Sequence, residues 1–132
     1  MQSTITKISN AVAYTTLAST DLDRSERFYR DTLGFDVERL PGPPNGLMVH
    51  AGKGTGLSVY ERSTPPNCDA TAMTLLVEDL DEAMSDMRTH GVKFEDYDLP
   101  YLKTTNGVVV EGASRASWFK DPDGNILSLV QM

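Results

Sequence analysis

The chain has 132 residues, of which 39% are hydrophobic and 23% charged, values that are typical of a globular protein and exclude wholesale disorder. Its net charge of −7, with scattered Lys and Arg residues, argues against a nucleic-acid partner, which requires clustered cations. A single cysteine, Cys68, and the lack of a signal peptide or a long apolar run lead us to expect a cytoplasmic protein with no membrane partner.

The first half of the chain predicts one strand, one helix and three further strands. Residues 11–19 are rich in β-branched and aromatic side chains, as strands are. The helix begins at Thr20 or Asp21, since either side chain can cap the first turn, and it ends at Gly34. The three strands that follow are expected at residues 35–40, 47–50 and 57–61.

The second half repeats this order. We expect a strand at residues 72–77, then a helix that begins at Asp79, which has capping-box spacing to Glu82, and ends at Gly91. The last three strands are expected at residues 92–97, 114–119 and 125–130. Asp121-Pro122-Asp123-Gly124 forms the turn of the final hairpin, because proline presets one turn position and glycine accepts a positive φ.

This internal repeat is the strongest signal in the sequence. Asp21-Leu22-Asp23 and Asp79-Leu80-Asp81 each follow a strand and open an amphipathic helix that a glycine ends. A unit this short buries little surface alone, so the two copies are expected to pack together. The prediction is an α+β protein of two tandem βαβββ modules, at about residues 10–62 and 70–132, within one domain of residues 1–132.

Several stretches resemble the sequence motifs of one family and occur in the same order. They are residues 20–29 with 33–35, residues 77–81 with 91–92, and residues 118–125. Together they resemble the vicinal oxygen chelate superfamily of glyoxalases, bleomycin-resistance proteins and extradiol dioxygenases. The resemblance implies that the modules form curved mixed sheets around a cup-shaped cleft, with cups completed by one chain or by paired subunits. It also implies a homodimer.

Enzymes of this superfamily hold a divalent metal between two modules, with ligands on the first and last strand of each. The resemblance places these positions at Tyr14 and Ser58 in module one and at Ala72 and Ser128 in module two. None of the four is His, Glu, Asp or Cys, and neutral groups are poor ligands for Mn, Fe, Ni or Zn. We therefore expect no metal and no other cofactor, with a displaced divalent metal as the alternative.

Three other residues are candidate replacements for these ligands. His90 lies in the last helical turn, where a cation is favoured by the helix dipole. His50 is open to three interpretations: a metal ligand, an acid/base group or a solvated edge residue. Glu61 is the one anionic candidate near Ser58, but strand alternation puts it on the opposite face.

Alternation also predicts the side chains that face the cup. They are largely uncharged and rich in hydroxyl groups, as in pockets for small organic molecules. The predicted set is Tyr14, Thr16, Ser58, Tyr60, Ala72, Thr74 and Ser128. Trp118 either packs in the core or stacks on a planar ligand, and Tyr97 and Tyr101 lie beside a segment that can act as a lid. The ligand-binding residues predicted from the sequence also include His50.

Two functions from different classes follow. The preferred one is a metal-free protein that sequesters or senses a small, partly aromatic molecule, as bleomycin-binding relatives do. The competing one is a lyase, isomerase or dioxygenase that uses a displaced metal, or proton transfer by Tyr14, Tyr60 or His50. A third reading is a degenerate module that serves only as a dimerisation partner.

Overall fold

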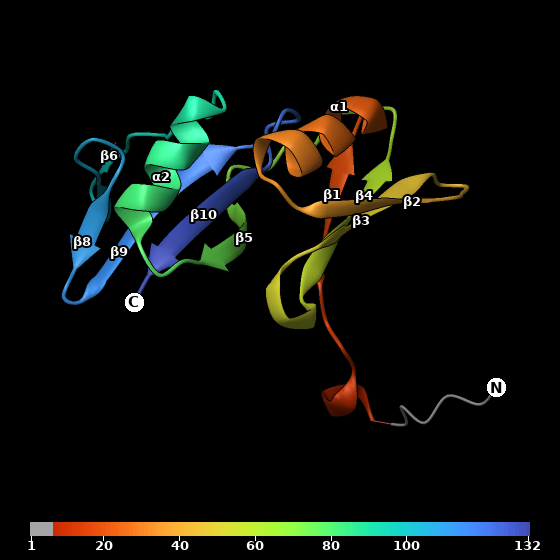
Figure 1. Cartoon of the computed structure of the whole chain (residues 1–132), viewed down its shortest axis with the longest axis horizontal. Coiled ribbons are helices and arrows are strands. Elements are labelled where there is room, and N and C mark those ends of the chain that lie inside the picture. Colours follow the sequence, from red (N-terminus) through yellow and green to blue (C-terminus); the bar gives the residue numbers. More distant parts are fainter. Residues whose placement is uncertain (1–6) are drawn as a thin grey trace.

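The computed structural model describes residues 7–132, and its elements repeat the predicted order of strand, helix and three strands (Figure 1). Module one contains β1 (Thr15–Ser19), α1 (Leu22–Arg27) with its π-helical extension η2 (Phe28–Thr32), β2 (Asp36–Leu40), β3 (Gly46–His50) and β4 (Gly56–Glu61). These strands form a sheet in the order β1-β4-β3-β2, in which β1 runs parallel to β4 and the other pairs are antiparallel. Two short 3₁₀ segments, η1 (Ile8–Asn10) and η3 (Gly52–Gly54), complete this half.

Module two has the same plan with an added hairpin. It contains β5 (Thr71–Leu76), α2 (Leu80–Thr89), β6 (Asp98–Leu99), β7 (Leu102–Lys103), β8 (Val109–Glu111), β9 (Ser114–Lys120) and β10 (Ile126–Gln131). The main sheet has the order β5-β10-β9-β8, with β5 parallel to β10, while β6 and β7 form a separate two-stranded hairpin. Both modules therefore place their first strand beside their last, as the tandem repeat predicts.

Both helices begin at an aspartate. Asp21 caps α1 by accepting a hydrogen bond from the backbone nitrogen of Arg24 at 3.1 Å, which settles the choice between Thr20 and Asp21. Asp79 caps α2 in the same way, through the backbone nitrogen of Glu82 at 3.0 Å. Within residues 7–132, we find no helix with the length and apolar character that crossing a membrane requires.

Two strand predictions need correction. The first strand begins at Thr15 rather than residue 11, and residues 11–14 form an extended arm instead. The predicted strand 92–97 is absent, and only Phe94 pairs there, in an isolated bridge with Phe119. The physical reason lies in Asp96, whose carboxylate draws the backbone into a loop by binding Thr104 and Gly107, so that β8 takes up the outer edge of β9 instead.

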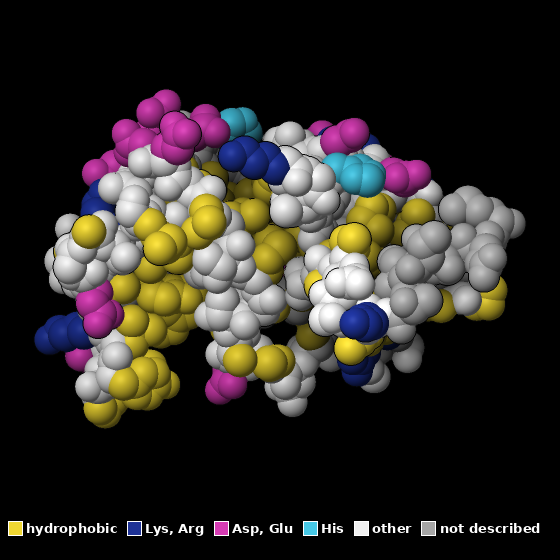
Figure 2. Space-filling view, turned by 90° about the horizontal axis from the view of Figure 1, so that it is seen from below, with side chains coloured by type: hydrophobic (Ala, Val, Ile, Leu, Met, Phe, Trp, Pro, Cys, Tyr) yellow, Lys and Arg dark blue, Asp and Glu magenta, His cyan; other side chains and the backbone are white. Residues whose placement is uncertain are grey.

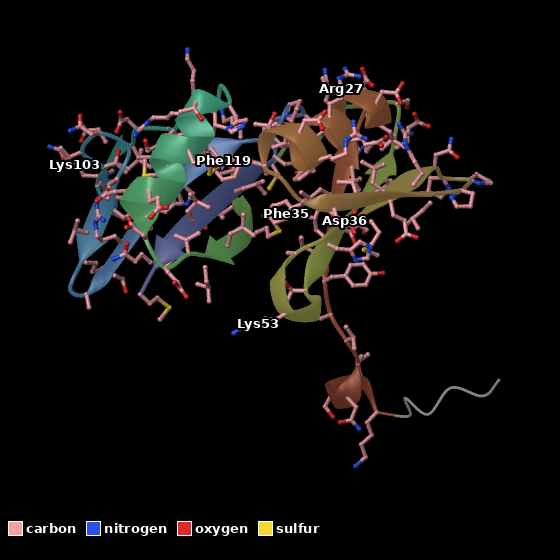
Figure 3. All side chains as sticks on the ribbon, viewed as in Figure 1. Arg27, Phe35, Asp36, Lys53, Lys103 and Phe119 are labelled. Atoms are coloured by element: carbon pink, nitrogen blue, oxygen red, sulfur yellow. The ribbon has the colours of Figure 1, made fainter. Side chains whose placement is uncertain are left out.

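A single hydrophobic core joins the two modules. The helix-facing side chains of both sheets belong to one cluster, which includes Leu17 and Leu57 from module one and Leu127 from module two. Phe119 of β9 lies between the modules (Figure 3), and its ring centroid is 6.5 Å from that of Phe28. The edges of the two sheets also meet, since the hydroxyl of Thr15 donates to the carbonyl of Ala72 at 3.2 Å.

Candidate functional site

Each sheet has one face covered by its helix and one face, here called the open face, on the opposite side. On β4, the buried Leu57 and Val59 point into the core, so alternation places Ser58 and Tyr60 on the open face. On β10, Leu127 and Leu129 point into the core, so Ser128 lies on the open face of the second sheet. Because both helix-facing surfaces belong to one core, the two open faces share the other side of the molecule.

Two pairs of hydroxyl groups occupy equivalent places on these open faces. Thr16 lies opposite Ser58 between parallel strands, and their hydroxyl oxygens are 2.9 Å apart. Thr74 lies opposite Ser128 in the same way, with an oxygen–oxygen distance of 2.6 Å. In each pair one hydroxyl donates to the other, so one O–H group per pair is left to donate elsewhere.

The open face of the second sheet carries a largely apolar cavity of about 500 Å³. Its floor is formed by Ala116 and Trp118 of β9 and by Val130 of β10, and its wall by the segment 99–103. Space-filling representation shows hydrophobic side chains gathered over a hollowed surface in this half of the molecule (Figure 2). A cavity of this size and lining suits a small organic molecule.

Trp118 is fixed in this cavity by two contacts. Its ring packs edge-on against Tyr97, with centroids 5.6 Å apart and planes at 85°. Its indole nitrogen donates to the hydroxyl of Thr71 at 3.2 Å. Burial, and to a lesser extent the charge of Glu95, raises the pKa of Tyr97, so this phenol is neutral at pH 7. The aromatic floor of the cavity is therefore pre-positioned and uncharged.

The wall of the cavity is held by an exposed carboxylate, that of Asp96. Asp96 accepts hydrogen bonds from the hydroxyl of Thr104 at 2.8 Å and from the backbone nitrogen of Gly107 at 2.7 Å, and these bonds lower the pKa of Asp96. They close the segment 97–107 into a compact loop that carries Leu99 and Tyr101. Tyr101 lines the cavity and is 84% exposed, so its ring is accessible from solvent.

A second, smaller cavity of about 210 Å³ lies at the other end of the open surface. Tyr14 and His50 both line it, together with Met48. The ring nitrogen Nε2 of His50 is 3.0 Å from a carboxylate oxygen of Glu38 on the neighbouring strand, and both side chains are about half exposed or more. The structure thus brings Tyr14 and His50 together but leaves them on a different module from Trp118.

The remaining predicted residues line neither cavity. Thr16, Ser58, Thr74 and Ser128 form the hydroxyl pairs, and Tyr60 follows Ser58 on the same face without lining either cavity. Glu61 points away from Ser58 and accepts a weak hydrogen bond from the amide of Asn45 at 3.4 Å. His90 bonds to the carbonyl of Asp86 at the end of α2, which accounts for it as a helix-terminal residue.

Comparison with known proteins agrees with this architecture. A family model described as the glyoxalase, bleomycin resistance protein and dioxygenase superfamily matches residues 11–129, which is nearly the whole chain. The chain belongs to this superfamily. No curated protein sequence matches it.

Solved structures of the superfamily superpose well on this one. An antibiotic-binding protein from Streptomyces sp. CB03234, TnmS3, is 25% identical, with a TM-score of 0.70 over 92% of this chain and 97% of its own. A glyoxalase/bleomycin resistance protein from the same strain is 26% identical, with a TM-score of 0.67 over 90% and 100%. A glyoxalase family protein from Enterococcus faecalis is 18% identical, with a TM-score of 0.70 over 92% and 98%.

The side chains at the superfamily's ligand positions do not fit a divalent metal. Ser58 and Ser128 are neutral hydroxyls already bonded to Thr16 and Thr74, and Ala72 offers no donor atom at all. Among residues 7–132, no group of three or more His, Cys, Asp and Glu side chains is arranged to hold a metal ion. At these four positions the open surface offers neutral hydrogen bonding and apolar contact.

Sequence reasoning missed much of the larger cavity. It singled out Trp118 and the neighbouring Tyr97 and Tyr101, but not Val130 or Ala116. Both could have been found by extending the alternation rule from Ser128 and Trp118 along their strands, since each is two positions away on the same face. No local sequence pattern indicates that Leu102 and Lys103 line the cavity, because their position depends on how the segment 97–107 folds back.

Proposed function

We propose that this protein binds a small, partly aromatic molecule without a metal, in the cavity on the open face of its second sheet. The observation that carries the proposal is the pre-positioned Trp118, fixed by Tyr97 and Thr71 on the floor of an apolar cavity of about 500 Å³. Burial of an aromatic ring between such side chains supplies affinity through lost water contact and stacking. The similarity to an antibiotic-binding relative supports the same kind of role.

The chain offers a built-in probe for this proposal. Trp118 is its only tryptophan, so its fluorescence reports directly on the cavity. We expect members of a panel of aromatic drugs and metabolites to change its emission and to raise the melting temperature. Tyr101→Ala should weaken that binding by about tenfold, because an exposed aromatic wall is lost. Tyr14→Ala, at the other end of the open surface, is the matched control and should leave the affinity unchanged.

One observation favours a second function. His50 and Tyr14 share the smaller cavity, and His50 pairs with Glu38 at 3.0 Å, an arrangement that suits proton transfer. This reading makes the protein a lyase or isomerase. Turnover of a substrate that His50→Gln abolishes would favour it, as would stoichiometric Mn, Ni, Zn or Fe in protein purified without chelators.

We also propose that the protein is a homodimer. The arm before β1 extends away from both modules (Figure 1), and it exposes Ile8 and Val12 at 91% and 80%. Leu76, on the second sheet, is exposed at 72%. Apolar side chains that gather into an exposed patch mark interaction sites, and we expect a second copy of the chain to bring these three into one interface. Light scattering should give twice the chain mass of 14.5 kDa, and a monomer at micromolar concentration would contradict this assignment.

A further inference from the structure

A further cavity, in module two, is lined by more positively than negatively charged side chains, although the chain as a whole is acidic. It lies on the helix-covered side of the sheet, between α2 and the segment 103–110, and has a volume of about 630 Å³. Three cations line it, Arg88, Lys103 and Arg115, against a single carboxylate, that of Asp81. The chain as a whole carries 19 acidic and 12 basic side chains, so this local excess of positive charge is not a reflection of composition.

The one carboxylate in the cavity neutralises only one of the three cations. Arg115 donates two hydrogen bonds to Asp81, at 2.8 and 3.2 Å, and this pairing lowers the pKa of Asp81. Arg88 and Lys103 form no ion pair with any carboxylate in residues 7–132. The cavity therefore keeps Lys103 and Arg88 without an ion pair, although the charge of Arg88 also acts on nearby Asp96, beside an Arg115 that Asp81 holds in place.

The guanidinium of Arg88 is held rather than loose. It lies over the ring of Phe94, 5.2 Å from its centroid, a cation–π contact that fixes one face of the group. Gly107 lies alongside Arg88 and Phe94. A Cβ atom added at Gly107 would lie 3.8 Å from Nη2 of Arg88 and 3.2 Å from Cβ of Phe94. Arg88 lines the cavity together with the polar residues Thr105 and Asn106.

We propose that this cavity binds the anionic group, carboxylate or phosphate, of a small molecule. A guanidinium and an ammonium that converge on one hollow supply charge-assisted hydrogen bonds, which are the strong ones. The inference goes beyond the proposed function, because the aromatic cavity lies on the open face and this one on the helix-covered face. The two adjoin only at the edge of the sheet, where Lys103, Val109 and Arg115 line both.

The test uses the full-length protein with inorganic phosphate and succinate as probes, in buffers matched for ionic strength with chloride. Binding is measured by calorimetry, and the melting temperature in chloride shows that each variant is folded. Arg88→Gln and Lys103→Gln remove the two cations of the cavity that form no ion pair within the described residues. Lys53→Gln is the matched control, because Lys53 is also an exposed lysine but lies on the other module (Figure 3).

Phosphate, succinate or both should bind wild-type protein and Lys53→Gln with equal affinity, and each cavity variant should bind about tenfold more weakly. Phosphate alone would identify a phosphate group as the ligand chemistry, and succinate alone a carboxylate. Binding that survives in both cavity variants would place the anion elsewhere and overturn the inference. The absence of binding by either anion to wild-type protein would overturn it as well.

Discussion

The phenol of Tyr29 donates a hydrogen bond to Oδ2 of Asp121 at 2.8 Å, and this bond crosses from module one to module two. Tyr29 is fully buried, and Asp121 is 5% exposed. The same carboxylate also accepts bonds from the side-chain and backbone nitrogens of Asn125, whose amide in turn donates to the carbonyl of Ala18. The turn after β9 is therefore a clamp that holds the modules, and with them the open surface, in one geometry.

Replacing Tyr29 with phenylalanine should lower the free energy of unfolding by about 2 kcal/mol at pH 7, because the buried Asp121 loses a donor. Urea unfolding measures this value. Tyr101→Phe removes an exposed phenol and should change stability by less than about 0.5 kcal/mol. Equal losses in the two variants would show that the Tyr29–Asp121 bond contributes nothing specific.

The same bond predicts a response to alkaline pH. Burial, and then the charge of Asp121, raises the pKa of Tyr29 well above its ordinary value. The stability that comes from this shift is complete below the unfolded-state pKa of about 10 and is lost as the pH rises towards the folded-state pKa. Wild-type protein should therefore lose stability more steeply above pH 10 than Tyr29→Phe does. Parallel pH profiles would contradict this assignment.

Asp123, in the same turn, should produce the opposite response on the acid side. Its side chain is 1% exposed and accepts a bond from Arg24 at 2.7 Å and another from the backbone nitrogen of Thr20. Burial acts to raise the pKa of Asp123, but hydrogen bonding to the Ser19 hydroxyl and to the backbone of Thr20, and the charge of Arg24, lower it below its ordinary value. Its contribution is thus present above the unfolded-state pKa of about 3.9 and is lost as the pH falls through the lower folded-state pKa.

Asp123→Asn should therefore cost about 2 kcal/mol of unfolding free energy at pH 7, a value discounted because Arg24 is 40% exposed. The difference from wild type should shrink as the pH falls below about 4, and denaturant unfolding across that range measures it. Asp31→Asn, which breaks a solvent-exposed ion pair with Arg30, is the control and should cost much less than Asp123→Asn. A difference that grows as the pH falls would refute the role given to Asp123.

Asp96 does not line the ligand cavity, but its replacement should weaken ligand binding there. Asp96→Ala removes the acceptor for Thr104 and for the backbone nitrogen of Gly107, and so loosens the loop that bears Tyr101. We expect ligand affinity to fall about tenfold and the Trp118 emission to shift to the red as its Tyr97 contact relaxes. Asp98→Ala changes a nearby exposed carboxylate and should leave both readouts as in wild type. Identical emission spectra for the two variants would rule this positioning role out.

Local signals predicted most of the fold. The Asp-Leu-Asp sequences mark real helix starts, because the first aspartate caps each helix through its own side chain. Alternation correctly separated the core-facing Leu57 from Ser58, since the burial of β4 follows a period of two. The predicted strand at residues 92–97 failed because the bonds that Asp96 makes to residues beyond it outweigh the strand propensity of that segment.

The candidate site was less predictable because it depends on contacts between distant segments. His50 and Glu38 form their contact across β2 and β3, and the register of these two strands cannot be predicted from the sequence. The wall formed by Leu99 and Tyr101 depends on the closure of the loop by Thr104. The positive charge of the cavity between α2 and the segment 103–110 arises only when these two segments come together. Each cation alone looks like an ordinary surface residue.

A titration of Trp118 fluorescence tests the central claim most directly. An aromatic compound that shifts the melting temperature is titrated once in buffer with EDTA and once in buffer with Mn²⁺, Zn²⁺, Ni²⁺ or Fe²⁺. Binding in the aromatic cavity without a metal predicts a saturable change of Trp118 emission with the same dissociation constant in every buffer. A change that appears only when a metal is supplied, or no change with any compound of the panel, would contradict it.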